Sequence, residues 1–233
     1  VIPRFRTGAR GVTKLLLHRI VEVQATTVTH QLTDTAEEYE FIEGLIETTK
    51  PEAPSGPWHY LIRTPFRYPL PAGVDYAARF KPPFSSRHIF YGTCLLRTAL
   101  YEFTYHWLKE RVHLIGLSQT EELRSRFAVG FLDPTLTDLT VDPGIHLIMD
   151  RRNYTASHQW ADAHPEATSI LYPSCREPER GSCVAAFKLE SFDLRPAESG
   201  LLFVSYSERA RAAQIRDPAG IMPSERIHWK DVA

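Results

Sequence analysis

The 233-residue chain contains an arginine, a tyrosine and a glutamate, in this order, whose side chains could together cleave a nucleotide. They are Arg67, Tyr91 and Glu102. An arginine fork can hold a phosphate or pyrophosphate at two points, a tyrosine can stack on a flat aromatic ring, and a carboxylate can stabilise positive charge that develops on a sugar. Residues of these types suit nucleotide cleavage if the fold brings them to one pocket.

Glu102 lies beside the apolar stripe of an expected helix, which Thr93 is expected to cap. The stripe recurs at helical spacing and consists of Leu96, Ala99, Leu100, Phe103 and Trp107. A carboxylate at the border of a buried face is costly unless it is hydrogen-bonded or faces a cleft. Glu102 is therefore the first candidate for a catalytic residue, with an electrostatic role. The alternative is an ordinary surface glutamate.

The candidate arginines and tyrosines each have a plain structural alternative. Arg67 is expected at the end of a strand over residues 59–62, and Arg79 after a glycine-containing loop. Either guanidinium could bind a phosphate or simply pair with a surface carboxylate. Tyr68 and Tyr91 could edge a flat ring, or be two ordinary core residues among the ten tyrosines of the chain.

No recognised metal or nucleotide motif is present in the sequence. His106 and His113 are not spaced to share one helical face, and His158 with His164 lacks a third ligand at a recognisable distance. We expect no metal requirement. The absence of GxGxxG, Walker A and GxSxG patterns disfavours Rossmann binding, P-loop chemistry and an α/β-hydrolase.

Composition excludes several classes of partner. The formal net charge is −1, so bulk electrostatics does not recruit nucleic acid or an anionic membrane. The apolar run Leu15-Leu16-Leu17 is far too short for a membrane span or a signal peptide. Three cysteines without a CxxC pair are typical of a reducing compartment, which predicts a cytoplasmic protein. Because the chain does not begin with Met, we expect that residues precede Val1, and the sequence does not tell which.

The N-terminal part predicts a helical arm. Thr35 and Glu38 form a capping-box pattern, an apolar stripe follows, and Lys50-Pro51 ends the helix near Thr49. Residues 51–57 are a proline-rich linker. Because the leader is too small for its own core, we expect residues 1–57 to pack as an arm on a main domain at 58–233.

The main domain is expected to have α+β architecture with mixed or antiparallel sheets and flanking helices. Strands outnumber helices and do not alternate with them, which argues against a doubly wound sheet. Besides the helix that carries Glu102, a helix is expected over residues 154–163. Strands are expected at 59–62, 88–91, 112–117, 129–132, 139–141, 169–172, 184–187 and 201–204.

The order and spacing of several short segments resemble the RES-domain family, the toxins of bacterial RES/Xre-type toxin–antitoxin pairs. No single segment is specific, but together they cover roughly residues 18 to 206. The segments are His18-Arg19-Ile20-Val21-Glu22, Glu37-Glu38, Lys50-Pro51, Thr64-Pro65-Phe66-Arg67-Tyr68-Pro69, Arg79-Phe80, Phe90-Tyr91-Gly92, Thr98-Ala99-Leu100-Tyr101-Glu102 and Tyr172-Pro173-Ser174-Cys175-Arg176.

This resemblance implies an ADP-ribosyltransferase-like fold that binds NAD as its substrate and breaks the nicotinamide–ribose bond. It implies a toxin that depletes NAD by hydrolysis or phosphorolysis and is inhibited by a cognate Xre-type antitoxin. The alternatives are transfer of ADP-ribose to a protein and a non-catalytic module that only binds a partner. The sequence leaves open the acceptor, the antitoxin surface and whether the chain forms a homo-oligomer.

The family pattern also assigns roles to individual residues. The expected catalytic residues are Glu102, Arg67, Tyr91 and Ser157, and the expected NAD-binding residues are Arg67, Tyr68, Arg79, Tyr91, Thr155, Ser174 and Arg176. Ser157 and Ser174 compete for the position of the family serine. Ser157 lies near an expected helix start and is placed slightly ahead, although a helix cap and a turn hydroxyl are ordinary alternatives for the two.

Overall fold

One twisted, mostly antiparallel sheet organises the computed structural model, which describes residues 5–6, 13–23, 33–67, 78–83, 85–113 and 121–233. Within these residues the sheet has ten strands in the order β10-β9-β8-β4-β2-β3-β7-β6-β5, with β1 paired to β2. Among the described strands, only β5 and β6 pair in parallel. The strands are β1 (Phe5–Arg6), β2 (Thr13–Glu22), β3 (Phe90–Thr93), β4 (Glu121–Phe131), β5 (Thr137–Asp138), β6 (Ser169–Pro173), β7 (Ser182–Ala186), β8 (Glu198–Ser207), β9 (Ala212–Arg216) and β10 (Glu225–His228).

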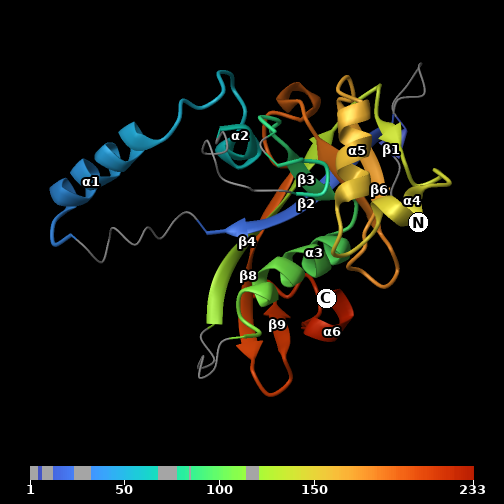
Figure 1. Cartoon of the computed structure of the whole chain (residues 1–233). Helices are drawn as coiled ribbons and strands as arrows, with labels where there is room; N and C mark the ends of the chain where they lie inside the picture. The colour runs from blue at the N-terminus through green and yellow to red at the C-terminus, as the bar shows by residue number, and fades with distance from the viewer. Residues whose placement is uncertain (1–4, 7–12, 24–32, 68–77, 84, 114–120) are drawn as a thin grey trace.

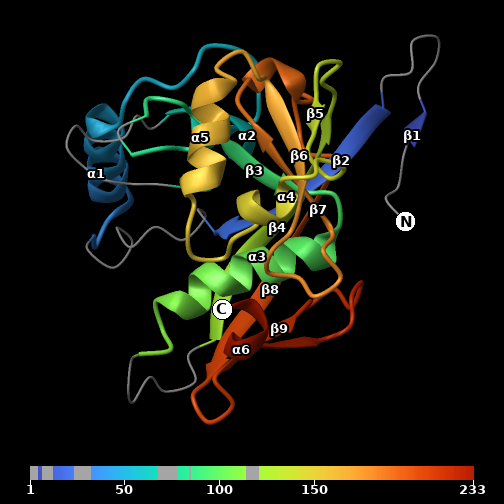
Figure 2. The ribbon, with the colours of Figure 1, turned by 45° about the vertical axis from the view of Figure 1, so that its right-hand side comes forward.

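The helices are distributed around this sheet and confirm the α+β class. The helix α3 lies between β3, which precedes it, and the β8–β9 ribbon (Figures 1 and 2). The helix α5 lies beside β6, and α1 is separate from the sheet in Figure 1. The helices are α1 (Ala36–Thr49), α2 (Tyr60–Arg67), α3 (Leu96–Lys109), α4 (Ile145–Ile148), α5 (Thr155–Ala163), the 3₁₀ turn η2 (Leu189–Ser191) and α6 (Trp229–Val232).

The strand β2 occupies the centre of the sheet, between β4 and β3. The sequence analysis placed these residues in a helical arm. Leu15 and Leu17 are buried in the core while Leu16 and His18 are only partly buried, which is the alternation of a strand. The unbroken Leu15-Leu16-Leu17 run concealed this alternation. Among the described residues of 1–57, α1 is the only helix, and the leader contributes a central strand to the domain.

The helix α1 forms as expected but buries none of its side chains. Thr35 and Glu38 make both bonds of the capping box. The apolar stripe is exposed, with Phe41 72% and Leu45 57% accessible. Local capping and helix propensity, rather than core packing, therefore define this helix.

Residues 59–62 were expected to form a strand and instead begin the helix α2. Leu61 and Ile62 are adjacent in sequence and both buried, whereas a half-buried strand would have placed them on opposite faces. The amide of Leu61 donates to Nδ1 of His59 at 3.3 Å, so a side chain satisfies one of the donors at the helix start. The four-residue window was too short to reveal a helical period.

The N-cap of α3 lies two residues after the expected one. Leu95 is the N-cap and makes no side-chain capping bond. Thr93 instead ends β3, and its hydroxyl donates to the carbonyl of Leu95 at 2.8 Å. The cap prediction was wrong because the strand extends to Thr93.

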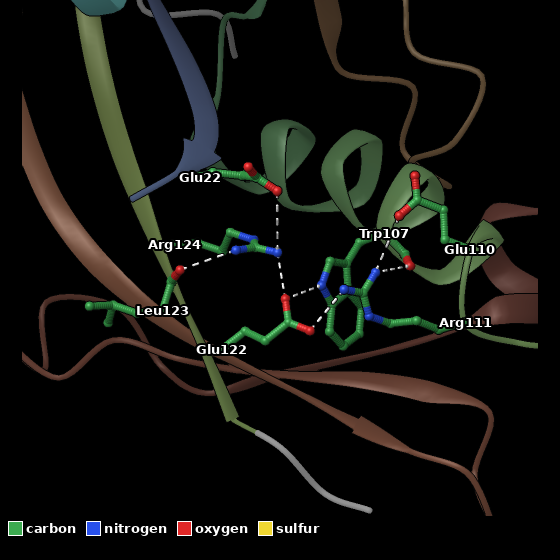
Figure 3. A network of polar contacts seen from close by, with 7 residues as sticks. All are labelled: Glu22, Trp107, Glu110, Arg111, Glu122, Leu123 and Arg124. Atoms are coloured by element: carbon green, nitrogen blue, oxygen red, sulfur yellow. Dashed lines mark hydrogen bonds and ion pairs between the residues drawn. The ribbon is translucent and has the colours of Figure 1, made fainter. Parts of the chain in front are cut away.

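A polar network fastens the C-terminal end of α3 to β4 (Figure 3). The carboxylate of Glu122 accepts hydrogen bonds from Trp107 Nε1 at 3.1 Å, Arg111 Nη2 at 2.8 Å and Arg124 Nη2 at 2.5 Å. The Arg111 guanidinium also lies over the Trp107 ring, 4.3 Å from its centroid. These contacts fix the orientation of the helix that carries Glu102.

Other expected elements are confirmed with shifted boundaries. The helix over 154–163 is α5, and the strands expected at 129–132, 169–172, 184–187 and 201–204 lie within or overlap β4, β6, β7 and β8. The strand expected at 139–141 was wrong, because these residues lie in the turn that follows the two-residue β5. The expected strand at 112–117 falls largely outside the described residues. The short elements β9, β10 and α6 were not expected.

The placement of β2 in the core gives a direct test by matched Leu→Ala substitutions. Leu17 is fully buried whereas Leu45 of α1 is largely exposed. We expect Leu17→Ala to lower the free energy of unfolding by about 2–5 kcal/mol and Leu45→Ala to change it by less than about 0.5 kcal/mol, as measured by urea denaturation. Equal effects of the two substitutions would contradict this assignment of the core.

Candidate active site

Glu102 projects from the middle of α3 toward the connection between β6 and β7. Its Oε1 accepts a hydrogen bond from Ser174 Oγ at 2.5 Å and a longer one from the Cys183 thiol at 3.8 Å. None of the described residues donates a hydrogen bond to Oε2. Among the described residues, the carboxylate is thus held through Oε1 alone.

Burial raises the pKa of the Glu102 carboxyl above its ordinary value. The hydrogen bond from Ser174 and the charges of Arg176 and Arg79 oppose this rise. A carboxylate whose charge is weakly solvated interacts strongly with nearby positive charge. Glu102 is therefore placed to respond to a cation that develops on a bound ligand.

Ser174 is the first residue of the loop between β6 and β7. Its hydroxyl accepts hydrogen bonds from the amides of Arg176 and Glu177, both at 3.0 Å, while donating to Glu102. The amide of Ser174 donates to the carbonyl of Gly181 at 2.7 Å, which closes the loop. The serine is buried and locked by four bonds, so it can hold the Glu102 carboxylate in one position.

Tyr91 lies on the face of the sheet that Glu102 approaches. The β3–β7 and β6–β7 registers pair Tyr91 with Ala185 and Tyr172 with Cys183, so Tyr91, Cys183 and Tyr172 point to the same face. Burial raises the pKa of Tyr172 well above its ordinary value, and the nearby groups Cys183, Glu102 and Tyr91 add to this. The Cys183 thiol on this face donates to Glu102, so Tyr91 and Glu102 border the same part of the sheet.

Arg79 approaches the same region from the residues before β3. Its guanidinium donates to the carbonyls of Ile148 and Asp150 and to Cys175 Sγ, the last at 2.9 Å. It also lies over the ring of Tyr154, 4.9 Å from the centroid. Arg79 is buried and positions the segment around α4 behind the site.

Arg67 does not join this group. It lies in the last turn of α2, where Nη2 forms an ion pair with Glu47 at 2.6 Å and Nε donates to the carbonyl of Pro51 at 2.7 Å. These contacts link α2 to α1 and the linker that follows it. Its predicted neighbour Tyr68 lies outside the described residues.

Arg176 lies beside the site, but other groups of the protein already occupy its hydrogen-bond donors. Its guanidinium donates to the carbonyls of Val232 at 2.9 Å and Arg151 at 2.7 Å and lies 3.4 Å from the centroid of the Tyr105 ring. The side chain is 2% exposed. Its charge lowers the pKa of Glu102, but its N–H donors bind α6 and the backbone of Arg151.

Of the two candidate serines, the structure brings Ser174 rather than Ser157 into contact with Glu102. Ser157 is also buried, but its hydroxyl donates to the carbonyl of Tyr154 at 2.8 Å within the first turn of α5. Thr155 is exposed, and its amide donates to Asn153 Oδ1 at 2.9 Å. These two residues serve the start of the helix in this structure.

A pocket of about 220 Å³ opens beside Ser174. Its lining includes Arg151, Ser174, Cys175, Glu177 and Arg180. Two arginines thus face a hollow whose wall contains the serine that binds Glu102. The site combines a carboxylate, a tyrosine-lined sheet face and a cationic pocket.

Sequence reasoning did not select Tyr172, Cys183, Arg151 or Arg180 for the site. Tyr172 precedes the Ser174 turn by two residues, so the turn itself was a signal for it. Cys183 is opposite Tyr172 in the β6–β7 register, and no one-dimensional pattern encodes that pairing. Arg151 and Arg180 come from separate loops, which only the folded chain brings to one pocket.

The described residues contain neither a cluster of three or more His, Cys, Asp or Glu side chains that could hold a metal ion nor a helix long and apolar enough to cross a membrane. The three cysteines are unpaired. Burial raises the pKa of Cys183 well above its ordinary value, so this thiol stays protonated and can donate to Glu102.

Comparisons with known proteins identify a family for most of the chain. The model of the RES domain family matches residues 51–204. A solved structure, the crystal structure of the M. tuberculosis MbcT–MbcA toxin–antitoxin complex, is similar to this chain with 9% identity and a TM-score of 0.43, over 84% of this chain and 86% of that one. No curated protein matches the sequence.

Ser→Ala substitutions at Ser174 and Ser157, which are equally buried, test which of the two serines acts on Glu102. The hydrogen bond from Ser174 lowers the pKa of Glu102, so Ser174→Ala should raise that pKa further. Ser157→Ala should leave it unchanged. The measurement is a carboxyl ¹³C NMR titration of glutamate-labelled protein, and an unchanged Glu102 titration in Ser174→Ala would contradict this role.

Proposed function

This chain belongs to the RES domain family, and we propose that it is the toxin of a bacterial toxin–antitoxin pair that degrades NAD by breaking the nicotinamide–ribose bond. The family membership supports the toxin class, and the geometry around Glu102 supports the chemistry. NAD carries a planar nicotinamide, a ribose and an anionic diphosphate. The site offers an aromatic face, a carboxylate and arginines for these three parts.

The observation that carries the proposal is the placement of the Glu102 carboxylate. Oε1 is fixed by Ser174, while Oε2 receives no hydrogen bond from the described residues. Burial of the carboxylate, which raises its pKa, strengthens its interaction with positive charge. Such a group stabilises an oxocarbenium-like ribose because it is oriented before the charge develops.

In the proposed reaction the bond between the ribose C1′ and the nicotinamide nitrogen breaks, and its electron pair leaves with neutral nicotinamide. The ribose carbon becomes positively charged, and Glu102 stabilises it. An acceptor oxygen then forms a new bond to C1′, and an acceptor that is water or a hydroxyl side chain releases one proton to solvent. Tyr91 edges the nicotinamide, and Ser174 keeps the carboxylate in place.

Water, inorganic phosphate and a protein side chain could each supply the acceptor oxygen. The corresponding activities are NAD hydrolysis, NAD phosphorolysis and ADP-ribosylation of a protein. A module that only binds a partner would not consume NAD. Incubation of the purified chain with NAD, with and without phosphate, followed by product identification, separates these activities.

We expect Glu102→Gln to lower the rate of NAD loss by roughly 10²–10³-fold, the usual effect of removing one preorganised electrostatic group. The amide keeps the shape and can still accept from Ser174, so NAD binding should persist. Glu110→Gln, an exposed glutamate at the end of the same helix, is the control. Unchanged turnover in Glu102→Gln would remove this residue from the mechanism.

The thermal stability of the same variant shows whether lost activity reflects misfolding. Because the folded pKa of Glu102 is raised, its stabilising contribution is full below the unfolded pKa and is lost as pH rises through the folded pKa. At neutral pH the substitution removes a poorly solvated charge, so the unfolding midpoint should stay equal or rise.

In the parent, the rate of NAD loss should fall with decreasing pH through the raised pKa of Glu102, because this carboxylate becomes protonated.

Expression of the parent chain without its partner should arrest bacterial growth while cellular NAD falls, and Glu102→Gln should relieve both effects because the chemistry is the cause. We propose an Xre-type antitoxin as the partner that covers the site. Growth arrest at normal NAD levels would instead favour modification of a protein target. Harmless expression of soluble, folded parent chain would favour the non-catalytic binding module.

A further inference from the structure

We infer that the pocket beside Ser174 is a phosphate site in which Arg151 and Arg180 bind the anion. Both side chains line this hollow of about 220 Å³. The inference rests on the proposed function only for the source of the phosphate group, which is the NAD diphosphate or inorganic phosphate. The pocket itself is argued from its contacts and charges.

The arginines selected from the sequence are already engaged by the protein. Arg67 binds Glu47 and the carbonyl of Pro51, and Arg79 binds two carbonyls and a thiol. Arg176 binds two carbonyls and covers an aromatic ring. An anion that enters beside Glu102 therefore needs other donors.

Arg151 and Arg180 retain such donors. Arg151 uses Nη1 for the carbonyl of Ala233 at 2.8 Å and forms no ion pair with any described residue. Arg180 is exposed, and among the described residues its guanidinium has no hydrogen bond or ion pair. Two guanidinium groups from different loops can each present parallel N–H donors to phosphate oxygens.

The acidic residue in the pocket wall does not cancel this charge. The Glu177 carboxylate accepts from Thr98 Oγ1 at 2.7 Å and from the amide of Gly181 at 3.0 Å, and Arg97 Nε lies 3.8 Å from it. The Glu177 carboxylate is therefore engaged by Thr98, Gly181 and Arg97. Among the described residues, neither pocket arginine forms an ion pair with it.

The backbone of Arg180 is held in an unfavourable conformation at this place. Its φ is 53°, in the left-handed region that a side chain with a Cβ rarely adopts. The turn is enforced because the amide of Arg180 donates to the Glu177 carbonyl at 3.0 Å and because any side chain at Gly181 would collide with Thr98 and Glu177. The loop therefore holds an arginine at the pocket where glycine would be less strained.

This strain provides a test with a matched control. Arg180→Gly removes the side chain and relieves the backbone, so the variant should fold with an equal or higher unfolding midpoint. Arg211 is also exposed, has a φ of 47° and lies in the β8–β9 turn away from the pocket. Arg211→Gly therefore makes the same change in charge and backbone elsewhere, and Arg151→Gln removes the second guanidinium.

The probes are inorganic phosphate and ADP, titrated separately into the full chain by isothermal titration calorimetry. We expect Arg180→Gly and Arg151→Gln each to weaken binding of at least one probe by roughly tenfold or more, the usual loss for a charged hydrogen bond. Arg211→Gly should bind as the parent does. Equal affinity of both probes for the parent and the two pocket variants would overturn the inference, as would an equal loss in Arg211→Gly.

The two probes distinguish the source of the phosphate group. Loss of ADP affinity, with phosphate competing against ADP, assigns the pocket to the NAD diphosphate. Loss of phosphate affinity alone, with phosphate still binding in the presence of ADP, assigns it to inorganic phosphate. A parent chain that binds these anions without consuming NAD would refute the proposed reaction and leave the phosphate site standing.

Discussion

The hydroxyl of Ser174 connects the elements that make up the site. It donates to Glu102 on α3 and accepts from two amides of its own loop, so a helix and a β-hairpin share one atom. Because a buried carboxylate is costly without such bonds, the orientation of α3 and the shape of the hairpin depend on each other. The Glu122 network at the other end of the helix supports the same orientation.

The fold was predictable where local rules govern it. The capping box of α1, the stripe of α3 and the helix α5 follow from short-range patterns, and the structure contains all three. The strand β2 was hidden because three consecutive leucines mask its alternation, and its central position comes from pairing with residues more than seventy positions away. The helix α2 was mistaken for a strand because a short apolar window does not distinguish the two periods.

The types of residue in the site were easier to predict than the partners that each side chain contacts. Glu102 contacts Cys183, which lies on the same sheet face as Tyr91, and the joint role of Tyr91 and Glu102 stays a prediction. The partners of arginines are harder to predict, because a guanidinium can bind carbonyls, carboxylates or aromatic rings, and the sequence does not say which of these it contacts. Arg67 forms an ion pair with Glu47 because of where α1 lies. The position of α1 depends on the tertiary structure and is not visible in the sequence. Ser174 reaches Glu102 across 72 positions.

Arg176 has a consequence for the timing of synthesis. It joins the loop of the site to the carbonyl of Val232, 56 positions later, so α6 completes the surroundings of Glu102. A ribosome that adds about 5–20 residues per second needs roughly 3–11 s to go from one to the other. During this interval the buried guanidinium lacks its final acceptor, and the growing polypeptide carries an unfinished site. The order of residues along the chain therefore postpones assembly until α6 has been made.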